Sequence, residues 1–258
     1  MVFKIPKSHP RAESLKTREK LIEGHNKGCV ATAGLIAQGR GEAFDYILGE
    51  KTNDFALSSI KASAAALLLA ENPVISVNGN VAILVPEEIA KLSKLINAKI
   101  EINLFYRTNK REKVIEKVLK NHGAGEVLGI GREASCYLKG IDHLRGRVSP
   151  KGIYNADIVF VPLEDGDRTK ALRDMGKKVI VVDLSPFSRS AKTATIAIVD
   201  NITRAMPALI KEIKIMKKLD KKKLEMIHSK YNNKKALSDS FKFMKNRLGE
   251  MAKVEKYE

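Results

Sequence analysis

The sequence predicts an α/β fold: a largely parallel sheet with helices on both faces and helical extensions at both ends. Two observations support this fold. Short apolar segments alternate with amphipathic segments and turns between residues 73 and 201, as in parallel sheets with crossover helices. The segments before and after this region repeat their apolar residues at helical spacing.

The N-terminal part of the chain predicts helices over residues 9–24, 28–37 and from about 53 to the Asn-Pro pair at 72–73. Pro10 suits the first turn of the first helix, and Gly24 suits its end. The second helix should end at the glycines on either side of Arg40. Thr52 or Asn53 is the expected cap of the third helix, which is rich in Ala and Leu.

Seven short apolar segments are predicted to be strands, over residues 74–77, 81–85, 100–105, 127–130, 157–162, 178–182 and 195–199. The intervening segments predict helices. One opens at Pro86 with Glu87 and Glu88 in its first turn, one runs to about His122 and one to about Met175. After Asn201 helices should run nearly to the C-terminus.

The chain contains no internal repeat and no low-complexity linker, so we expect a single α/β domain over residues 1–258. Its expected parts are an N-terminal helical layer (1–72), a sheet core (73–201) and C-terminal helices (202–258).

Composition excludes several classes of protein. The formal net charge of +17 favours an anionic partner. Two cysteines, Cys29 and Cys136, exclude a disulfide framework and a cysteine-rich zinc site. No apolar run approaches the ~20 residues that a membrane span needs, and the N-terminus lacks a signal-peptide core, so we expect a cytoplasmic protein. Abundant Lys with few Cys hints at a thermophile.

The positive charge is concentrated near the C-terminus, where residues 204–258 hold 16 Lys and Arg against 7 Asp and Glu. One interpretation is a basic surface that binds nucleic acid. The other, which we favour, is a solvated helix face, because Ile210, Ile213, Met216 and Leu219 recur every three residues between the charges. Nucleic-acid binding is therefore the unlikelier function.

Polar residues follow most of the predicted strands: 78–80, Arg107, 131–132, 164–168, 183–193 and 200–201. Ligands of open parallel sheets bind outside the carboxyl ends of the strands. Each turn alone has an ordinary explanation as a cap or tight turn, but their convergence on one edge predicts a binding site.

The densest polar stretch is 183–193, which combines hydroxyl groups with Arg189, Lys192 and Asp183. Hydroxyl and backbone N–H groups can donate to phosphate oxygens, and an arginine adds a bidentate fork. This loop suits a triphosphate; the alternative is an ordinary surface loop.

Several familiar sites are missing. The chain contains no Walker A motif, no complete dinucleotide fingerprint, no nucleophile elbow and no His-Glu-x-x-His. The five histidines are scattered, so no metal site is predicted from protein ligands. Cys136 is expected to be a buried structural thiol.

Six stretches carry a longer pattern: Ser-His-Pro-Arg-Ala-Glu-Ser-Leu (8–15), Gly-Leu-Ile-Ala-Gln-Gly-Arg-Gly-Glu-Ala-Phe-Asp (34–45), Val-Asn-Gly-Asn (77–80), Pro-Leu-Glu-Asp-Gly-Asp-Arg (162–168), Asp-Leu-Ser-Pro-Phe-Ser-Arg (183–189) and Thr-Ile-Ala-Ile-Val-Asp-Asn (195–201). Together they resemble the archaeal phosphopantothenate synthetases, also called 4-phosphopantoate–β-alanine ligases. The similarity runs from about residue 5 to about residue 255. Gln38 and Ser185 depart from the residues that are frequent in the family.

The resemblance implies a Rossmann-like fold, a homodimer and a reaction on the route to coenzyme A. In that reaction ATP drives the joining of 4-phosphopantoate to β-alanine, with release of AMP and diphosphate through an acyl-adenylate, and Mg²⁺ bridges the phosphates. It implies ATP contacts at Arg18, Arg40, Val182, Asp183, Leu184, Ser188, Arg189, Asp200 and Asn201.

From the strand ends we expect the substrate phosphate and carboxylate to be held by Asn78, Asn80, Arg107 and Arg132. Arg107 precedes a predicted helix N-terminus, where a cation and the helix dipole would both favour an anion. The alternative for Asn78 and Asn80 is that they shape a hairpin between two strands. No residue is assigned as the base that deprotonates the β-alanine amine.

Overall fold

The computed structural model describes residues 6, 8–9, 11–163 and 166–253. Six parallel strands form one sheet in the order β3-β2-β1-β6-β7-β8. They are β1 (Pro73–Val77), β2 (Lys99–Ile102), β3 (Val127–Leu128), β6 (Ile158–Pro162), β7 (Lys178–Val182) and β8 (Ile196–Ile198). If these six strands are numbered one to six along the chain, their order in the sheet is 3-2-1-4-5-6, which is the order of a Rossmann fold. The order reverses between β1 and β6, and this is the switch point of the sheet. The α/β, Rossmann-like prediction is therefore confirmed.

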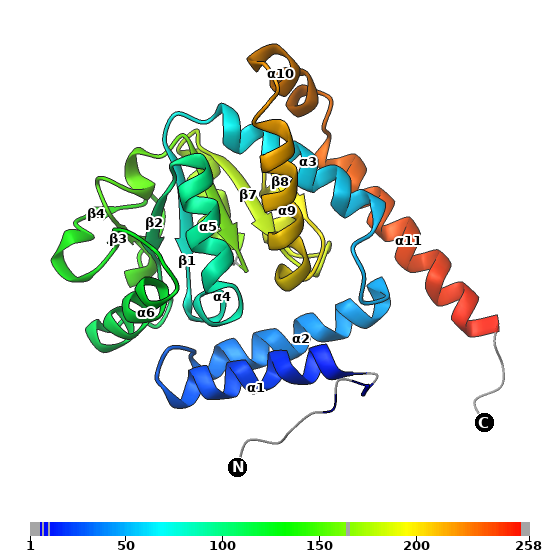
Figure 1. The fold of residues 1–258 in the computed structure, drawn as a ribbon, viewed down its shortest axis with the longest axis horizontal. Helices are drawn as coiled ribbons and strands as arrows, with labels where there is room; N and C mark the ends of the chain where they lie inside the picture. Colours follow the sequence, from blue (N-terminus) through cyan, green and yellow to red (C-terminus); the bar gives the residue numbers. More distant parts are fainter. Residues whose placement is uncertain (1–5, 7, 10, 164–165, 254–258) are drawn as a thin grey trace.

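The described helices are α1 (Ala12–Asn26), α2 (Thr32–Leu48), α3 (Asp54–Leu69), α4 (Gly79–Leu84), α5 (Pro86–Ile96), α6 (Asn109–Asn121), α7 (Gly166–Asp174), α8 (Arg189–Thr193), α9 (Ile202–Met216), α10 (Lys221–Ser229) and α11 (Asn233–Lys253). Figure 1 shows them around the sheet and at both ends of the chain. None of the helices described here is long and apolar enough to cross a membrane.

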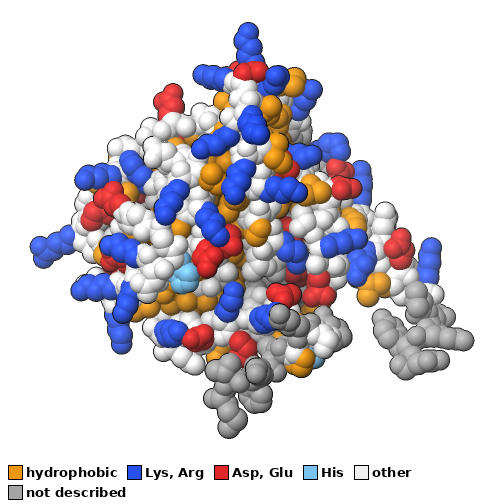
Figure 2. All heavy atoms as spheres, in the orientation of Figure 1, with side chains coloured by type: hydrophobic (Ala, Val, Ile, Leu, Met, Phe, Trp, Pro, Cys, Tyr) orange, Lys and Arg blue, Asp and Glu red, His pale blue; other side chains and the backbone are white. Residues whose placement is uncertain are grey.

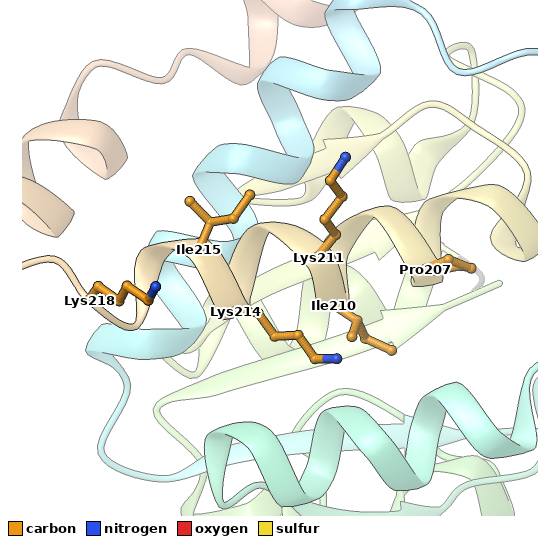
Figure 3. Close-up of a pocket in the computed structure, with 6 residues that line it drawn as sticks. All are labelled: Pro207, Ile210, Lys211, Lys214, Ile215 and Lys218. Carbon is orange, nitrogen blue, oxygen red and sulfur yellow. The ribbon is translucent and has the colours of Figure 1, made fainter.

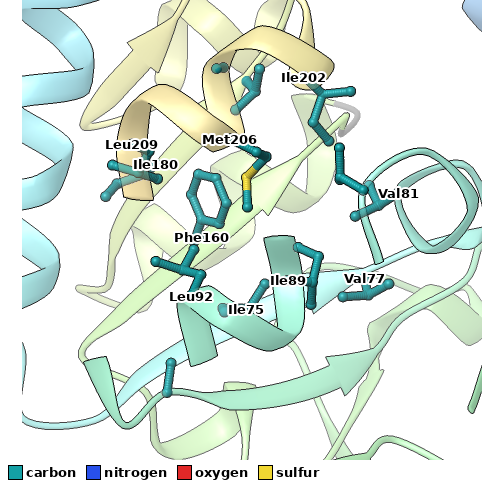
Figure 4. Close-up of a cluster of buried hydrophobic side chains, with 14 of the residues drawn as sticks. Ile75, Val77, Val81, Ile89, Leu92, Phe160, Ile180, Ile202, Met206 and Leu209 are labelled. Carbon is teal, nitrogen blue, oxygen red and sulfur yellow. The ribbon is translucent and has the colours of Figure 1, made fainter. Parts of the chain in front are cut away.

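One face of the sheet packs against α4, α5 and α9. Ile75, Phe160 and Ile180 point to this face from neighbouring strands, and Leu92 and Met206 meet them from the helices (Figure 4). All five side chains are fully buried, so they exclude water from this face. Such continuous burial requires the nearly uninterrupted apolar runs that predicted these strands.

The opposite face uses the alternate residues of the same strands. Val159, Val161 and Val181 lie in a second core with Leu172 of α7 and Met244 of α11. Successive side chains of a strand point to opposite faces, so this second core follows from the same apolar runs. Helices therefore cover both faces of the sheet.

The helices α1 and α2 lie side by side at the carboxyl ends of the strands (Figure 1). The predicted polar turns after β1, β2, β3, β7 and β8 lie at this edge, because the strands of the sheet are parallel. The N-terminal helical layer is therefore part of the edge where a Rossmann sheet binds its ligands.

Most predicted elements are present. The first helix begins within the predicted range, although its expected first-turn residue, Pro10, lies outside the described residues. Asn53 is the N-cap position of α3, and Pro86 opens α5 with Glu87 and Glu88 in the first turn.

The strand predicted over 81–85 is wrong, because Gly79–Leu84 forms the helix α4. The Asn78 side chain caps this helix by accepting a hydrogen bond from the Val81 N–H at 3.1 Å. A short apolar run does not distinguish a buried strand from a buried helix, and the cap decides for the helix. The hairpin alternative for Asn78 and Asn80 is therefore also wrong.

The helix predicted over 28–37 has the wrong bounds, because α2 begins at Thr32 and continues through Gly39 and Gly41 to Leu48. A helical glycine costs about 1 kcal/mol relative to alanine, which burial of the rest of the helix can offset. A Cβ on Gly41 would lie 3.4 Å from Leu184 Cδ1, so this glycine brings α2 close to the end of β7.

Two further elements were not predicted. The loop 183–193 contains the short helix α8, and a two-stranded antiparallel hairpin joins β4 (Cys136–Tyr137) to β5 (Arg147–Val148). Cys136 is only partly buried, so the prediction of a buried thiol is wrong.

Candidate functional site

The helix α2 crosses the carboxyl edge of the sheet from β1 to β7. Near its start, Asn80 Nδ2 donates a hydrogen bond of 2.9 Å to the Gly34 carbonyl. Further along, Gly41 packs against Leu184, the second residue after β7. Arg40 is thereby placed at the end of β7.

Asp183 follows β7 directly and lies within range of the Arg40 charge. Its carboxylate accepts hydrogen bonds from the Ser185 N–H at 2.9 Å and from the Ser188 side chain. Burial raises the pKa of Asp183, and these two donors together with Arg40 oppose the rise. The structure thus brings together Arg40, Asp183, Leu184 and Ser188, and their contact with ATP stays a prediction.

Arg189 begins the short helix α8, which Ser188 caps by accepting a hydrogen bond of 3.0 Å from the Ala191 N–H. The Arg189 guanidinium lies 2.8 Å from an Asp167 oxygen, and both side chains are more than 70% exposed. An exposed pair of this kind contributes little stability, so Arg189 can exchange Asp167 for a ligand at low cost. The neighbouring Glu164 and Asp165, also in a predicted turn, lie outside the described residues.

Asp200 and Asn201 follow β8 and are nearly fully buried. Asp200 Oδ2 accepts a hydrogen bond of 2.6 Å from the Thr52 hydroxyl, and Arg204 contacts the other carboxylate oxygen. Asn201 caps α9 through Thr203. The end of β8 is therefore tied to the segment that precedes α3.

Arg18 projects from α1 onto α2. Its guanidinium pairs with Glu42 at 2.6 Å and lies 3.4 Å from the Tyr46 hydroxyl. These partners raise the pKa of Arg18, with the Glu42 hydrogen bond as the largest cause. Arg18 thus contacts the helix that carries Arg40, although its proximity to a nucleotide stays a prediction.

The residues predicted to hold the second substrate have mostly internal partners. Asn78 Nδ2 donates to the Leu163 carbonyl at 2.8 Å, and Asn80 donates to Gly34. Arg132 is exposed, and no hydrogen bond or ion pair involves its side chain within the described part of the chain.

Arg107 is buried and pairs with Glu112 at 2.5 Å. Its other donors reach the carbonyls of Gly129 and Arg147. This arrangement favours a structural role, because it ties the ends of β2 and β3 to the β4–β5 hairpin.

Three charged residues at this edge were missed: Glu42, Asp45 and Arg204. Gln38, Glu42 and Asp45 are buried polar residues on α2 at the spacing i, i+4, i+7. Polar residues repeated at helical spacing within an apolar helix are a usable signal for a buried polar face. Asp200 precedes Arg204 by four residues, a spacing at which charges on a helix pair, but nothing near Arg204 indicates its other partner, Asp45.

A hollow of about 510 Å³ lies on the outer side of α9, lined by Pro207, Ile210, Lys211, Lys214, Ile215 and Lys218 (Figure 3). A second hollow of about 460 Å³ separates α1 from α5 and α6. Across the face shown in Figure 2, Lys and Arg are interleaved with acidic and apolar groups. Ile210, Ile213 and Met216 are buried and Lys211, Lys214, Lys217 and Lys218 are exposed, so this segment has the amphipathic pattern on which the interpretation as a solvated helix face was based.

Among the described residues, no three His, Cys, Asp or Glu side chains lie together as potential metal ligands. Two arginines at this edge, Arg40 and Arg189, are exposed. Arginine forks suit phosphate groups.

Comparison with known proteins gives a consistent assignment. Residues 55–247 match the family model described as phosphopantothenate/pantothenate synthetase. The 4-phosphopantoate–β-alanine ligase of Thermococcus onnurineus is 52% identical over 251 residues, which cover 97% of this chain and 96% of that protein. The protein of the same name from Thermococcus kodakarensis is 53% identical over 249 residues, covering 96% and 95%.

A third relative with this name, from Methanosarcina mazei, is 52% identical over 248 residues, covering 96% of this chain and 97% of that protein. The family model spans the whole six-stranded sheet and the C-terminal helices as far as residue 247, and the relatives span nearly the whole chain. The resemblance inferred from the six sequence stretches is confirmed, and this chain belongs to the phosphopantothenate/pantothenate synthetase family.

Proposed function

We propose that this protein is an ATP-dependent ligase that joins 4-phosphopantoate to β-alanine. The product is 4′-phosphopantothenate, an intermediate of coenzyme A biosynthesis, and the by-products are AMP and diphosphate. The observation that carries the proposal is the identity of 52–53% to 4-phosphopantoate–β-alanine ligases over almost the full chain. The Rossmann sheet with arginines at its carboxyl edge supports it.

ATP would bind across the ends of β7 and β8. Arg40 and Arg189 supply charge for the phosphates, while the backbone at Val182, Asp183 and Leu184 lines the site. Ser188, Asp200, Asn201 and Arg18 complete the proposed contacts. The proximity of Arg40 to Asp183, and the exposure of Arg189, support this arrangement.

Release of AMP requires activation of the pantoate carboxylate. A carboxylate oxygen attacks the α-phosphorus of ATP, and the bond to diphosphate breaks. The β-alanine amine, having lost a proton, then attacks the acyl carbon, and AMP leaves. Positioning and charge stabilisation by the arginines would supply most of the catalysis in the first step. No residue is assigned to the proton transfer.

Mg²⁺ would bind to the protein together with the triphosphate of ATP. A magnesium ion keeps several waters and binds one or two carboxylates together with substrate phosphates. Asp183 is the carboxylate at this edge that lies within range of Arg40, and it is partly accessible. Asp183 would therefore be the carboxylate that helps to hold this ion.

For the 4-phosphopantoate, Arg132 has the most suitable surroundings of the four candidates, since its side chain is exposed after β3. Arg107 would act by holding the neighbouring loops, because its guanidinium is committed to Glu112 and to carbonyl groups.

A homodimer and a cytoplasmic location remain part of this proposal. The helix α2 exposes Thr32, Ala33, Ile36 and Ala37, with Ile36 at 71% exposure. An exposed apolar stripe of this kind favours contact with a second copy, because a twofold interface repeats one patch. Sedimentation of the wild type and Ile36→Lys measures whether this stripe holds a dimer.

The direct test is an assay of AMP release in the presence of ATP, Mg²⁺, 4-phosphopantoate and β-alanine. Turnover should require all of these components. AMP formation that is independent of β-alanine, or no formation at all, would contradict the ligase. Salt-sensitive binding of nucleic acid without turnover would favour the alternative function as a basic nucleic-acid-binding protein.

A further inference from the structure

Two carboxylates from distant parts of the chain share one guanidinium. Arg204 Nη2 lies 2.6 Å from Asp45 Oδ1 and 2.7 Å from Asp200 Oδ1. Arg204 Nη1 and Nε add hydrogen bonds of 3.1 Å to Asp45 and 3.0 Å to Asp200. Arg204 therefore bridges α2, which carries Asp45, to the end of β8, which carries Asp200.

The remaining acceptor positions of both carboxylates are also used. Asp200 Oδ2 accepts from the Thr52 hydroxyl at 2.6 Å, and Asp45 Oδ2 accepts from Asn201 Nδ2 at 2.8 Å. The side chains of Asp45 and Asp200 are 9% and 0% exposed. Both carboxylates are thus held by side chains of this cluster.

Stability alone does not explain this cluster. Two carboxylates and one guanidinium leave an excess negative charge in a buried position, and buried ion pairs are often no more stabilising than apolar side chains of similar volume. What the cluster does provide is fixed geometry. It connects α2, the loop at Thr52 and the end of β8. A single hydrogen bond would not fix the relative positions of these three segments.

Those connected segments carry two separate parts of the proposed nucleotide site. Arg40 lies on α2, five residues before Asp45 and so on the same rigid helix. Asn201 follows β8 and is held by both Asp45 and the start of α9. A change in the Asp45–Arg204 contact would therefore alter the spacing between Arg40 and Asn201.

We propose that Arg204 and Asp45 are positioning residues that hold Arg40 and the Asp200-Asn201 turn at the spacing that ATP requires. They act through other residues and need not touch the nucleotide. This inference rests on the proposed function, because it takes ATP to be bound at this edge of the sheet.

The first test compares Arg204→Ala, Arg204→Lys and Asp45→Asn with the wild type in the AMP-release assay. Arg204→Ala should raise the KM for ATP by about ten- to a hundredfold, since a misplaced Arg40 would lose a charge-assisted phosphate contact of about 1.5–3 kcal/mol. Arg204→Lys should recover part of the loss, because it keeps the charge without the bidentate fork. The KM for β-alanine should stay unchanged.

A matched control separates positioning from general destabilisation. Lys177 is buried at the amino end of β7, where it donates to the carbonyls of Tyr154 and Ala156 at 2.7 and 2.8 Å. Lys177→Ala should lower the Tm and leave the KM for ATP unchanged. If Arg204→Ala likewise lowers the Tm but leaves the KM for ATP unchanged, the positioning role is refuted. Asp45→Asn, which keeps the side-chain shape, supplies the same comparison where Arg204→Ala does not fold.

The second test measures coupling between Arg204 and Arg40. If Arg204 works by placing Arg40, then Arg40→Ala should raise the KM for ATP less in the Arg204→Ala background than in the wild type. If the two substitutions raise the KM for ATP by factors that simply multiply in the double variant, the proposal is wrong. A wild-type protein without ATP-dependent AMP release would refute the proposed function itself, whereas normal wild-type turnover with unaltered variants would refute only the positioning role.

Discussion

The side chain of Asn80 lies against the backbone of Gly34, with a hydrogen bond of 2.9 Å from Asn80 Nδ2 to the Gly34 carbonyl. A Cβ on Gly34 would overlap the side-chain oxygen of Asn80. The absence of a side chain at residue 34 therefore allows α2 to rest on the turn after β1. This contact fixes one end of the helix that carries Arg40.

Replacing Gly34 by alanine should destabilise the protein. The new methyl group must displace Asn80, and overpacking of this kind costs about 1–3 kcal/mol. Gly39→Ala is the matched control on the same helix, because a Cβ there meets no atom within 4 Å. It should raise the free energy of unfolding by up to about 1 kcal/mol through helix propensity. Denaturant titrations measure the unfolding free energy of both variants. If the two substitutions change it equally, the packing of Asn80 against Gly34 is wrong.

Arg189→Ala should weaken ATP binding without unfolding the protein. A charge-assisted phosphate contact contributes about 1.5–3 kcal/mol, which corresponds to roughly ten- to a hundredfold in affinity. Stability should hardly change, because the Arg189–Asp167 pair is exposed. Isothermal titration calorimetry with ATP measures the affinity, and the Tm measures the fold.

The control for Arg189 is Lys170→Ala on α7. Lys170 also forms an exposed ion pair, at 2.5 Å to Asp174, but it lies outside the proposed ATP contacts. Its removal should leave the affinity for ATP unchanged. Unchanged affinity in Arg189→Ala as well would remove Arg189 from the site.

Arg107→Ala should mainly reduce stability. The variant leaves the Glu112 carboxylate, whose side chain is 2% exposed, without its guanidinium partner. Breaking a buried pair in this way costs about 3–5 kcal/mol. Thermal unfolding gives the size of the loss, and Glu112→Gln should reproduce much of it.

Steady-state kinetics decide between this structural role and direct contact of Arg107 with substrate. If Arg107→Ala keeps its stability but raises the KM for 4-phosphopantoate and not for ATP, then Arg107 binds that substrate and the structural interpretation is wrong. The same measurement on Arg132→Ala should show a raised KM for 4-phosphopantoate with an unchanged Tm.

Glu101 should make stability depend on pH. Burial raises its pKa from 4.5 to about 7, against hydrogen bonds from the N–H groups of Ile153 and Ser149 and the charge of Arg168. The folded protein therefore holds this proton more tightly than the unfolded chain. The contribution of Glu101 to stability is greatest below about pH 4.5 and is lost as the pH rises through about 7.

The comparison that isolates this effect is wild type against Glu101→Gln. Between about pH 5 and pH 8, the unfolding free energy of the wild type should fall relative to the variant by up to roughly 2–3 kcal/mol. Denaturant titrations at both pH values provide the measurement. Parallel pH profiles of the two proteins would show that the pKa of Glu101 is not raised.

The strands β1, β6 and β7 could be predicted because a buried parallel strand requires a continuous apolar run, which is visible locally in the sequence. The same reasoning failed at α4, where an apolar run is buried as a helix. The order of strands in the sheet could not be read from the runs themselves, since pairing joins segments that are far apart in the chain.

The sequence by itself determined the α/β class and family, and it placed hydroxyl and basic residues after the strands. Only the tertiary structure decided their partners. It buried Arg107 against Glu112, left Arg189 exposed and joined Asp45 to Arg204 across 159 residues. Local patterns report which residues a helix or strand buries. Ion pairs between distant segments depend on how the chain folds back, so they leave no periodic signal in the sequence.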